Sequence, residues 1–105
     1  MTNKRIVLTT CGSEEETDRI AHYLVENRLA ACVNVIPRIK SIYRWQGKVE
    51  SSEERLLVVK TTAEQFTQIQ DAIKELHSYE LSECIAIAID DGSAAYLEWV
   101  EENVR

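Results

Sequence analysis

The sequence predicts an α+β fold with the element order β-α-β-β-α-β, followed by a C-terminal helix. Apolar, β-branched runs alternate with segments of helical periodicity, and two long strand-like arms meet at Gln46 and Gly47. Two split βαβ units in this order form a ferredoxin-like sandwich, an antiparallel sheet with both main helices on one face. Because the 105 residues contain no linker, repeat or low-complexity segment, residues 1–105 are expected to form a single domain.

The first strand and helix are predicted between residues 5 and 28. Residues 5–11, RIVLTTC, form a short apolar run that Gly12 interrupts. Ser13, with Glu16 three residues later, fits a capping box. A helix should therefore begin at this point and continue to about Arg28.

The two arms at residues 29–45 and 48–62 predict a β-hairpin that is too long for the core of a small domain. Pro37 cannot donate to a strand ladder, so the strand is either interrupted or bulged there, or Pro37 lies on an edge. Tyr43 and Trp45 come just before the turn, where small polar residues are usual. We expect these two aromatic side chains to pack against another copy of the chain.

The second half of the chain should contain a helix, a strand and a last helix. Thr62 and Gln65 fit another capping box. An apolar stripe follows it with helical spacing: Phe66, Ile69, Ile73 and Leu76. Residues 84–89 then alternate Ile with Cys or Ala, which predicts a strand, and Ser93 should cap the final helix. With both main helices on one face, the opposite apolar face of the sheet is left uncovered.

Composition narrows the possible partners. The net charge is −6, which disfavours nucleic acid as a partner. No apolar run approaches the ~18 residues of a membrane span, and the N-terminus has no signal-peptide pattern, so we expect no membrane partner. The three cysteines have neither zinc nor redox spacing, which favours buried, reduced thiols. These features together predict a cytoplasmic protein.

The densest group of polar side chains lies at His77, Tyr79, Glu80 and Glu83. Imidazole and carboxylate are suitable ligands for copper and zinc, although a histidine at a helix end can instead bind loop carbonyls. Lys60 ends a buried strand and is expected near this loop. Together with Tyr79 it would line a ligand pocket, either binding an anion beside Glu83 or pairing and reaching to water.

Other polar residues are expected to have structural or solvent-exposed roles. His22 should lie on the surface, and Asn34 should find its hydrogen bonds within the sheet or an interface. The charged residues of the second arm should form a solvated edge or pair between subunits: Glu50, Glu53, Glu54 and Arg55. An acyl phosphatase is the rival enzyme class, but no Gly-rich loop precedes a helix and no nucleophile-base order is evident, so we expect no enzymatic activity.

Several separate segments resemble, in order, the signature segments of the CutA divalent-cation-tolerance family. They are VENRLAACVNVIP, SIYRWQGKVE, LLVVKT, HSYELSE and YLEWV. The resemblance runs from about Arg5 to Val100. It implies a ferredoxin-like homotrimer with Tyr43 and Trp45 at its interface, a cytoplasmic location, and tolerance of divalent metals, copper above all, without established catalysis. Trimers of the GlnB type are similar in fold, which leaves a small-molecule-sensing trimer as the alternative function.

The sequence departs from the family pattern near the candidate metal site. Ser78 and Ser82 stand where the family usually has prolines. The cysteine associated with copper in some members corresponds to Thr9 here, whereas Cys11 lies two residues later on the same face of the strand. The resemblance and the polar residues together predict weak binding of copper(II) or another divalent cation, not required for folding, by His77, Glu83 and Cys11.

Overall fold

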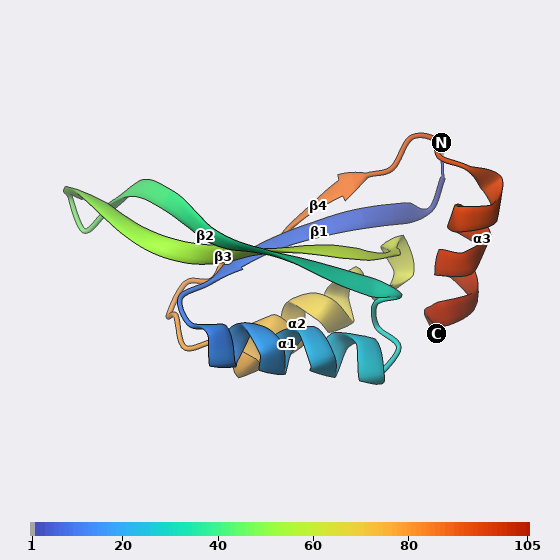
Figure 1. Cartoon of the computed structure of the whole chain (residues 1–105), viewed down its shortest axis with the longest axis horizontal. Helices are drawn as coiled ribbons and strands as arrows, with labels where there is room; N and C mark the ends of the chain where they lie inside the picture. Colours follow the sequence, from blue (N-terminus) through green and yellow to red (C-terminus); the bar gives the residue numbers. More distant parts are fainter. Residues whose placement is uncertain (1) are drawn as a thin grey trace.

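The computed structural model describes residues 2–105 and has the predicted order of elements (Figure 1). The elements are β1 (Lys4–Cys11), α1 (Glu14–Glu26), β2 (Cys32–Trp45), β3 (Lys48–Thr62), η1 (Ala63–Gln65), α2 (Phe66–Leu76), β4 (Ile85–Ala88) and α3 (Ala94–Asn103). The sheet has the order β2-β3-β1-β4, and every neighbouring pair is antiparallel. Helices α1 and α2 both lie on one face of this sheet, while α3 stands at its end (Figure 1). The predicted α+β sandwich is confirmed.

The core lies between the sheet and the two main helices. Because side chains alternate along a strand, one face of β1 and β3 points toward α1 and α2. The fully buried aliphatic side chains come from both layers: Val7, Ile20, Leu24, Leu57, Val59, Ile69 and Ile73. Each contributes roughly 1.5–3 kcal/mol by leaving water. This packing fixes the ends of β1, α1 and α2 relative to one another.

The start of α1 confirms the predicted N-cap. Ser13 has extended backbone, and its Oγ accepts a hydrogen bond from the backbone N–H of Glu16 at 3.1 Å. In a full capping box the Glu16 carboxylate would return to the backbone of Ser13. It instead accepts a hydrogen bond from the backbone N–H of Ser78, at 2.7 Å. The first turn of α1 is thereby joined to the loop after α2.

The predicted capping box at Thr62 and Gln65 is wrong. Thr62 is the last residue of β3, where it pairs with Lys4, and its side chain makes no capping hydrogen bond. The chain turns through η1 first, and α2 begins only at Phe66. Ser93 does occupy the N-cap position of α3, but its side chain also makes no capping hydrogen bond.

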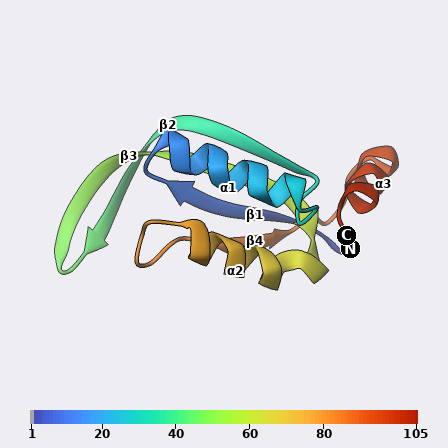
Figure 2. The same cartoon turned by 90° about the horizontal axis from the view of Figure 1, so that it is seen from below.

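The hairpin formed by β2 and β3 extends beyond the helices and bends toward the side where the α2–β4 loop lies (Figure 2). The register shifts between Ile36 and Ile39, so Pro37 lies at a bulge, on a strand that is also at the edge of the sheet. The turn places Gln46 at φ 49° and Gly47 at φ 81°, which matches a tight hairpin turn with two left-handed residues.

The sheet face opposite α1 and α2 carries apolar side chains without a helix over it (Figure 1). Ile6 pairs with Ile87, and Leu8 pairs with both Ile85 and Val58, so these residues share one face. Ile85 and Ile87 are 52% and 47% exposed. The sheet therefore has the uncovered apolar face that the sequence predicts. Strand β4 (Ile85–Ala88) is shorter than the expected 84–89. Across residues 2–105, no helix is long and apolar enough to cross a membrane.

Candidate metal centre

Three potential metal ligands meet where β1, α1 and α2 come together. Cys11 is the last residue of β1, Glu16 lies in the first turn of α1, and His77 caps the C-terminus of α2. One ligand atom from each lies within 4.8 Å of the other two. All three residues are buried. A thiol, a carboxylate and an imidazole therefore converge at one point inside the protein.

The hydrogen bonds of His77 determine which ring nitrogen can bind a cation. Nε2 lies 2.6 Å from the carbonyl oxygen of Thr10 and must donate, because a carbonyl only accepts. In the neutral ring Nδ1 is then an acceptor, and it receives the backbone N–H of Tyr79 at 3.1 Å. Nδ1 also lies 3.0 Å from Glu16 Oε1, which is another acceptor. This contact is favourable only with a proton or a cation shared between the two atoms.

Glu16 is in the form that a metal requires. Burial acts to raise its pKa, but the hydrogen bonds from Ser78 and the nearby His77 and Arg19 outweigh burial and hold the pKa below its usual range. The carboxylate is therefore ionised at neutral pH. Its Oε1 is directed at the imidazole of His77.

The pKa of Cys11 is shifted in the opposite direction, toward the protonated form. Burial, together with the negative charges of Glu16 and Glu54, raises the pKa of its thiol, and a hydrogen bond with Thr17 only partly offsets this. Because the thiolate is the form that binds metal, a cation must displace the thiol proton. Metal binding at this cluster should therefore release a proton.

The structure brings together two of the three ligands proposed from the sequence. Cys11 and His77 lie in the cluster, whereas Glu83 is exposed and lines a separate pocket. The third member of the cluster is Glu16, which the sequence reading assigned only to the capping box. Its role depends on the packing of α1 against the end of α2, for which no local pattern exists.

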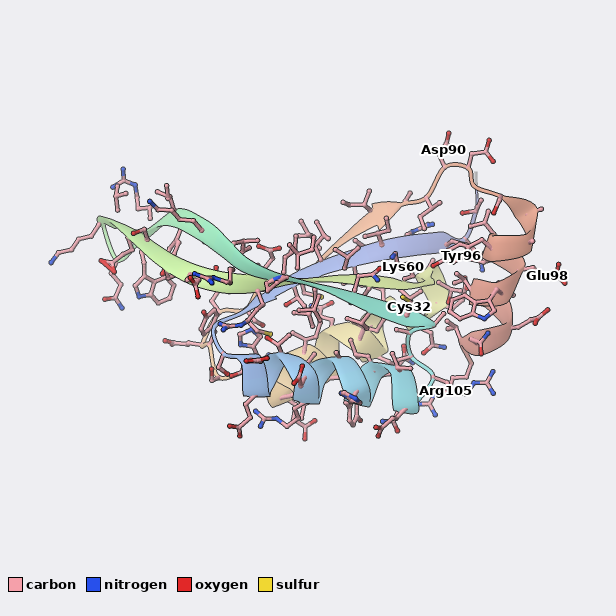
Figure 3. The ribbon with its side chains drawn as sticks, in the orientation of Figure 1. Cys32, Lys60, Asp90, Tyr96, Glu98 and Arg105 are labelled. Atoms are coloured by element: carbon pink, nitrogen blue, oxygen red, sulfur yellow. The ribbon has the colours of Figure 1, made fainter. Side chains whose placement is uncertain are left out.

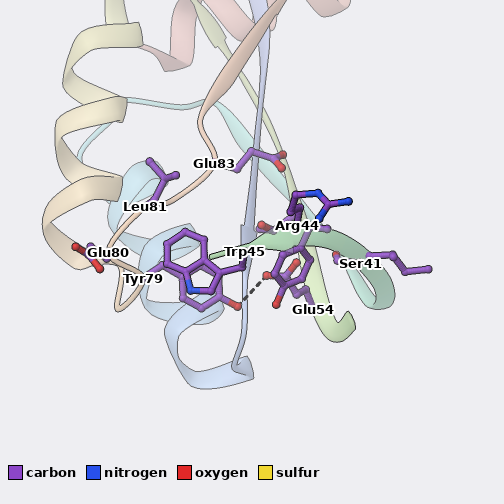
Figure 4. A pocket seen from close by; sticks show the side chains of 11 residues that line it. Ser41, Arg44, Trp45, Glu54, Tyr79, Glu80, Leu81 and Glu83 are labelled. Carbon is purple, nitrogen blue, oxygen red and sulfur yellow. Dashed lines mark hydrogen bonds between the residues drawn. The ribbon is translucent and has the colours of Figure 1, made fainter. Parts of the chain in front are cut away.

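A pocket of about 690 Å³ lies next to the cluster, between the hairpin and the loop that follows α2 (Figure 4). Tyr79 borders both. Its ring centroid lies 4.5 Å from that of His77, and its hydroxyl donates a hydrogen bond to Glu54 Oε2 at 2.8 Å. A Cβ added to Gly12 would come within 2.6 Å of the Tyr79 hydroxyl. The ring thus closely covers the chain beside Cys11.

Glu54 corrects a second sequence expectation. The charged residues of the second arm were expected to form a solvated edge or to pair between subunits, but Glu54 is only 6% exposed within the single chain. Its hydrogen-bond partner is Tyr79, 25 residues later in the sequence. The two residues become neighbours only because the hairpin bends over the loop after α2. Burial and the hydrogen bond to the Glu54 carboxylate raise the pKa of Tyr79 well above its usual range. The Tyr79 hydroxyl therefore stays protonated and donating.

Lys60 is not close to Tyr79. It pairs across the sheet with Ile6 and Cys32, and Figure 3 shows it beside Cys32, near α3. Six residues of β3, or roughly 20 Å of strand, separate Lys60 from Glu54, the hydrogen-bond partner of Tyr79. Its Nζ donates to the side-chain oxygen of Asn34, which supplies Asn34 with the hydrogen bond it was expected to need. The two residues proposed for one ligand pocket thus lie at different ends of the sheet.

The remaining predicted residues lie on the surface. His22 is exposed on α1, as expected. Tyr43 and Trp45 are 42% and 41% exposed near the hairpin turn, and both also line the pocket. Their predicted role at a subunit interface stays a prediction.

The model of the CutA1 divalent ion tolerance protein family matches residues 5–103. The chain belongs to this family. It is 48% identical over 100 residues to a divalent-cation tolerance protein CutA of Thermus thermophilus, covering 95% of this chain and 97% of the relative. It is 43% identical over 93 residues to Protein CutA of Homo sapiens, covering 89% of this chain and 52% of the human protein. The chain thus spans about half the length of that relative.

Solved CutA structures have the same fold. The protein titled Cut A1 from Thermus thermophilus superimposes with a TM-score of 0.95 at 47% identity, covering 97% of this chain and 99% of the other. CutA from Xylella fastidiosa gives a TM-score of 0.96 at 35% identity, covering 99% and 100%. The resemblance noted from the sequence segments is confirmed. The family description names tolerance of divalent ions and no catalytic activity.

Proposed function

We propose that this CutA-family protein binds a divalent transition-metal ion at Cys11, Glu16 and His77, and that this binding is its part in divalent-cation tolerance. The observation that carries the proposal is the convergence of the three donor atoms within 4.8 Å. The contact between His77 Nδ1 and Glu16 Oε1 at 3.0 Å supports it further. Two ligands about 2.0–2.1 Å from one tetrahedral ion lie only slightly farther apart than this.

The donor set selects the class of metal. One sulfur, one imidazole nitrogen and one carboxylate oxygen suit copper and zinc, whereas calcium and magnesium prefer ligand sets made of oxygen. Three protein ligands leave one coordination position open for water or a second molecule. We expect the protein to need no metal to fold, because its core is formed mainly by aliphatic side chains of the sheet and helices, with Cys11 as the one cluster residue among them.

Binding should be modest and should strengthen with rising pH. The raised pKa of Cys11 means that the metal competes with a proton for the sulfur. His77 Nδ1 must also release the backbone N–H of Tyr79. Both costs reduce affinity relative to a preformed, ionised site. A reducing compartment such as the cytoplasm, our proposed location, would keep the thiol available.

We further propose that the functional unit is a homotrimer, as the resemblance implies. The apolar face of the sheet supports this, because Ile85 and Ile87 remain half exposed in the single chain. The exposed Tyr43 and Trp45 side chains of the hairpin supply further apolar area. Burial of both surfaces by other copies would remove them from water.

The test is titration with Co²⁺, which binds like zinc and does not oxidise thiols. We expect absorption from thiolate-to-cobalt charge transfer in the wild type, reversed by competing Zn²⁺. Cys11→Ser should abolish the band, and Glu16→Gln should weaken binding about ten-fold, since outer or direct ligand losses commonly cost 10–100-fold. Glu83→Gln is the matched control and should bind as the wild type does. Unchanged binding by Cys11→Ser would place the metal elsewhere or nowhere.

A further inference from the structure

Tyr79 joins the metal cluster to the β2–β3 hairpin. Its backbone N–H donates to His77 Nδ1 at 3.1 Å, and its hydroxyl donates to Glu54 Oε2 on β3 at 2.8 Å (Figure 4). The rings of His77 and Tyr79 also lie against each other, with centroids 4.5 Å apart. One residue therefore contacts a proposed metal ligand and the hairpin at the same time.

The hairpin contacts the cluster at a second point, directly beside the first. Arg55 pairs with Cys11 in the sheet, and its guanidinium donates to the backbone carbonyl of Gly12 at 3.1 Å. Gly12 in turn lies against Tyr79, since a Cβ added to this glycine would come within 2.6 Å of the tyrosine hydroxyl. A displacement of the Tyr79 hydroxyl would therefore disturb the contacts that hold the hairpin here.

The hairpin also has a point at which it can bend. The register of β2 and β3 shifts between Ile36 and Ile39, and Ile39 pairs with Glu54 directly after this bulge. Arg38, within the bulge, has a φ of 58°, which is uncommon for a residue other than glycine. A bulge bends its strand and interrupts the ladder. The contact between Tyr79 and Glu54 is thus made where the outer part of the hairpin begins.

A metal ion on His77 and the observed hydrogen bond from Tyr79 exclude each other. Nε2 of His77 donates to the Thr10 carbonyl, so Nδ1 carries the one ring lone pair that is left for a cation. The backbone N–H of Tyr79 occupies this lone pair in the structure. A ligand shifts a conformational equilibrium only if its contacts differ between the two states. Here the contact that differs is the hydrogen bond from Tyr79 to His77.

We propose that metal binding at the cluster is coupled to the docking of the β2–β3 hairpin, with Tyr79 as the positioning residue between them. The inference rests on the proposed metal site. A cation at His77 releases the backbone of Tyr79, the side chain moves with it, and the hydrogen bond to Glu54 weakens. Because coupling is reciprocal, the contact between Tyr79 and Glu54 in turn opposes metal binding. The hairpin carries Tyr43 and Trp45, so the coupling extends to the surface that we propose for the trimer interface.

The test is a Zn²⁺ titration of the full chain followed by NMR, with the affinity itself measured by competition against Co²⁺. The indole N–H signals of Trp45 and Trp99 report on the hairpin and on α3. We expect saturable shifts of Trp45 and of the Gly47 amide at the turn, while Trp99 stays unchanged. Zn²⁺ binding without these shifts would overturn the coupling and leave the metal site standing. Absence of Zn²⁺ binding would instead overturn the metal site, and the coupling with it.

A variant of Tyr79 separates its two contacts. Tyr79→Phe keeps the backbone N–H and removes the hydroxyl, so it should tighten Zn²⁺ binding about five-fold or more and reduce the shift of Trp45. A general loss of structure would weaken binding instead. Tyr96→Phe removes a hydroxyl from α3 and should leave both quantities unchanged. Wild-type affinity or an undiminished Trp45 shift in Tyr79→Phe would overturn the relay through Glu54. The wild-type titration needs no variant and decides the coupling if Tyr79→Phe fails to fold.

Discussion

The Tyr79 hydroxyl donates a 2.8 Å hydrogen bond to Glu54, and this bond links the loop after α2 to the β2–β3 hairpin. We predict that Tyr79→Phe lowers the free energy of unfolding by about 1.5–3 kcal/mol, the range for hydrogen bonds to charged groups, because it leaves a buried carboxylate without its donor. Urea denaturation at one fixed protein concentration measures this. Tyr96→Phe is the control, since Tyr96 is 43% exposed and stacks on Trp99 through its ring, which phenylalanine keeps. Equal loss in both variants would contradict the assigned role of the hydroxyl.

The two serines at helix starts should differ in their contribution to stability. Ser13→Ala removes the acceptor of the Glu16 backbone N–H and should cost about 1 kcal/mol. Ser93→Ala should cost clearly less, because the Ser93 side chain makes no capping hydrogen bond. Denaturant unfolding of the two variants gives the comparison. A larger loss for Ser93→Ala would mean that the capping contacts are misassigned.

Glu16 should make stability depend on pH below neutrality. Its pKa is lower in the folded protein than the ordinary glutamate value of 4.5, so its contribution to stability is present above pH 4.5 and is lost as the pH falls through the folded value. Glu16→Gln should therefore flatten the decline of stability in this acid range. Thermal unfolding across a pH series measures the slope. Glu83→Gln, an exposed carboxylate outside the cluster, should retain the wild-type slope, and an equally flat profile there would remove the special role of Glu16.

The hairpin and α3 each carry one tryptophan, and these should affect assembly differently. We predict that Trp45→Ala weakens the proposed trimer more than Trp99→Ala does. Trp45 projects on the hairpin, whereas Trp99 stacks on Tyr96 of its own helix, with ring centroids 5.6 Å apart. Anchoring aromatic residues at interfaces commonly cost upwards of about 2 kcal/mol on truncation. Sedimentation equilibrium over a dilution series tests this, and equal dissociation of the two variants, or a monomeric wild type, would contradict it.

Local patterns in the sequence were sufficient for the fold but not for the site. The capping of α1 by Ser13 depends on residues within one turn, so it was predictable. The pattern at Thr62 was locally equivalent, yet pairing of Thr62 with Lys4 across the sheet prevents the same role. Tertiary context here outweighs a short-range signal.

The site depends on contacts between residues far apart in the chain. His77 was proposed as a metal ligand for its chemistry and Cys11 through the family resemblance, and the fold brings the two together. Glu16 was missed because its capping position gave it a sufficient local role, and Glu54 was missed because an acidic hairpin strand normally faces water. Only the meeting of helix ends and the bend of the hairpin reveal the roles of these two carboxylates.

The central claim, a metal site formed by Cys11, Glu16 and His77, is tested most directly by X-ray absorption spectroscopy of the zinc-loaded protein. The account predicts one sulfur at about 2.3 Å, with nitrogen and oxygen ligands at about 2.0–2.2 Å. Cys11→Ser should lose the sulfur contribution and retain the lighter ligands. A zinc spectrum with only nitrogen and oxygen ligands in the wild type, unchanged in Cys11→Ser, would contradict the claim.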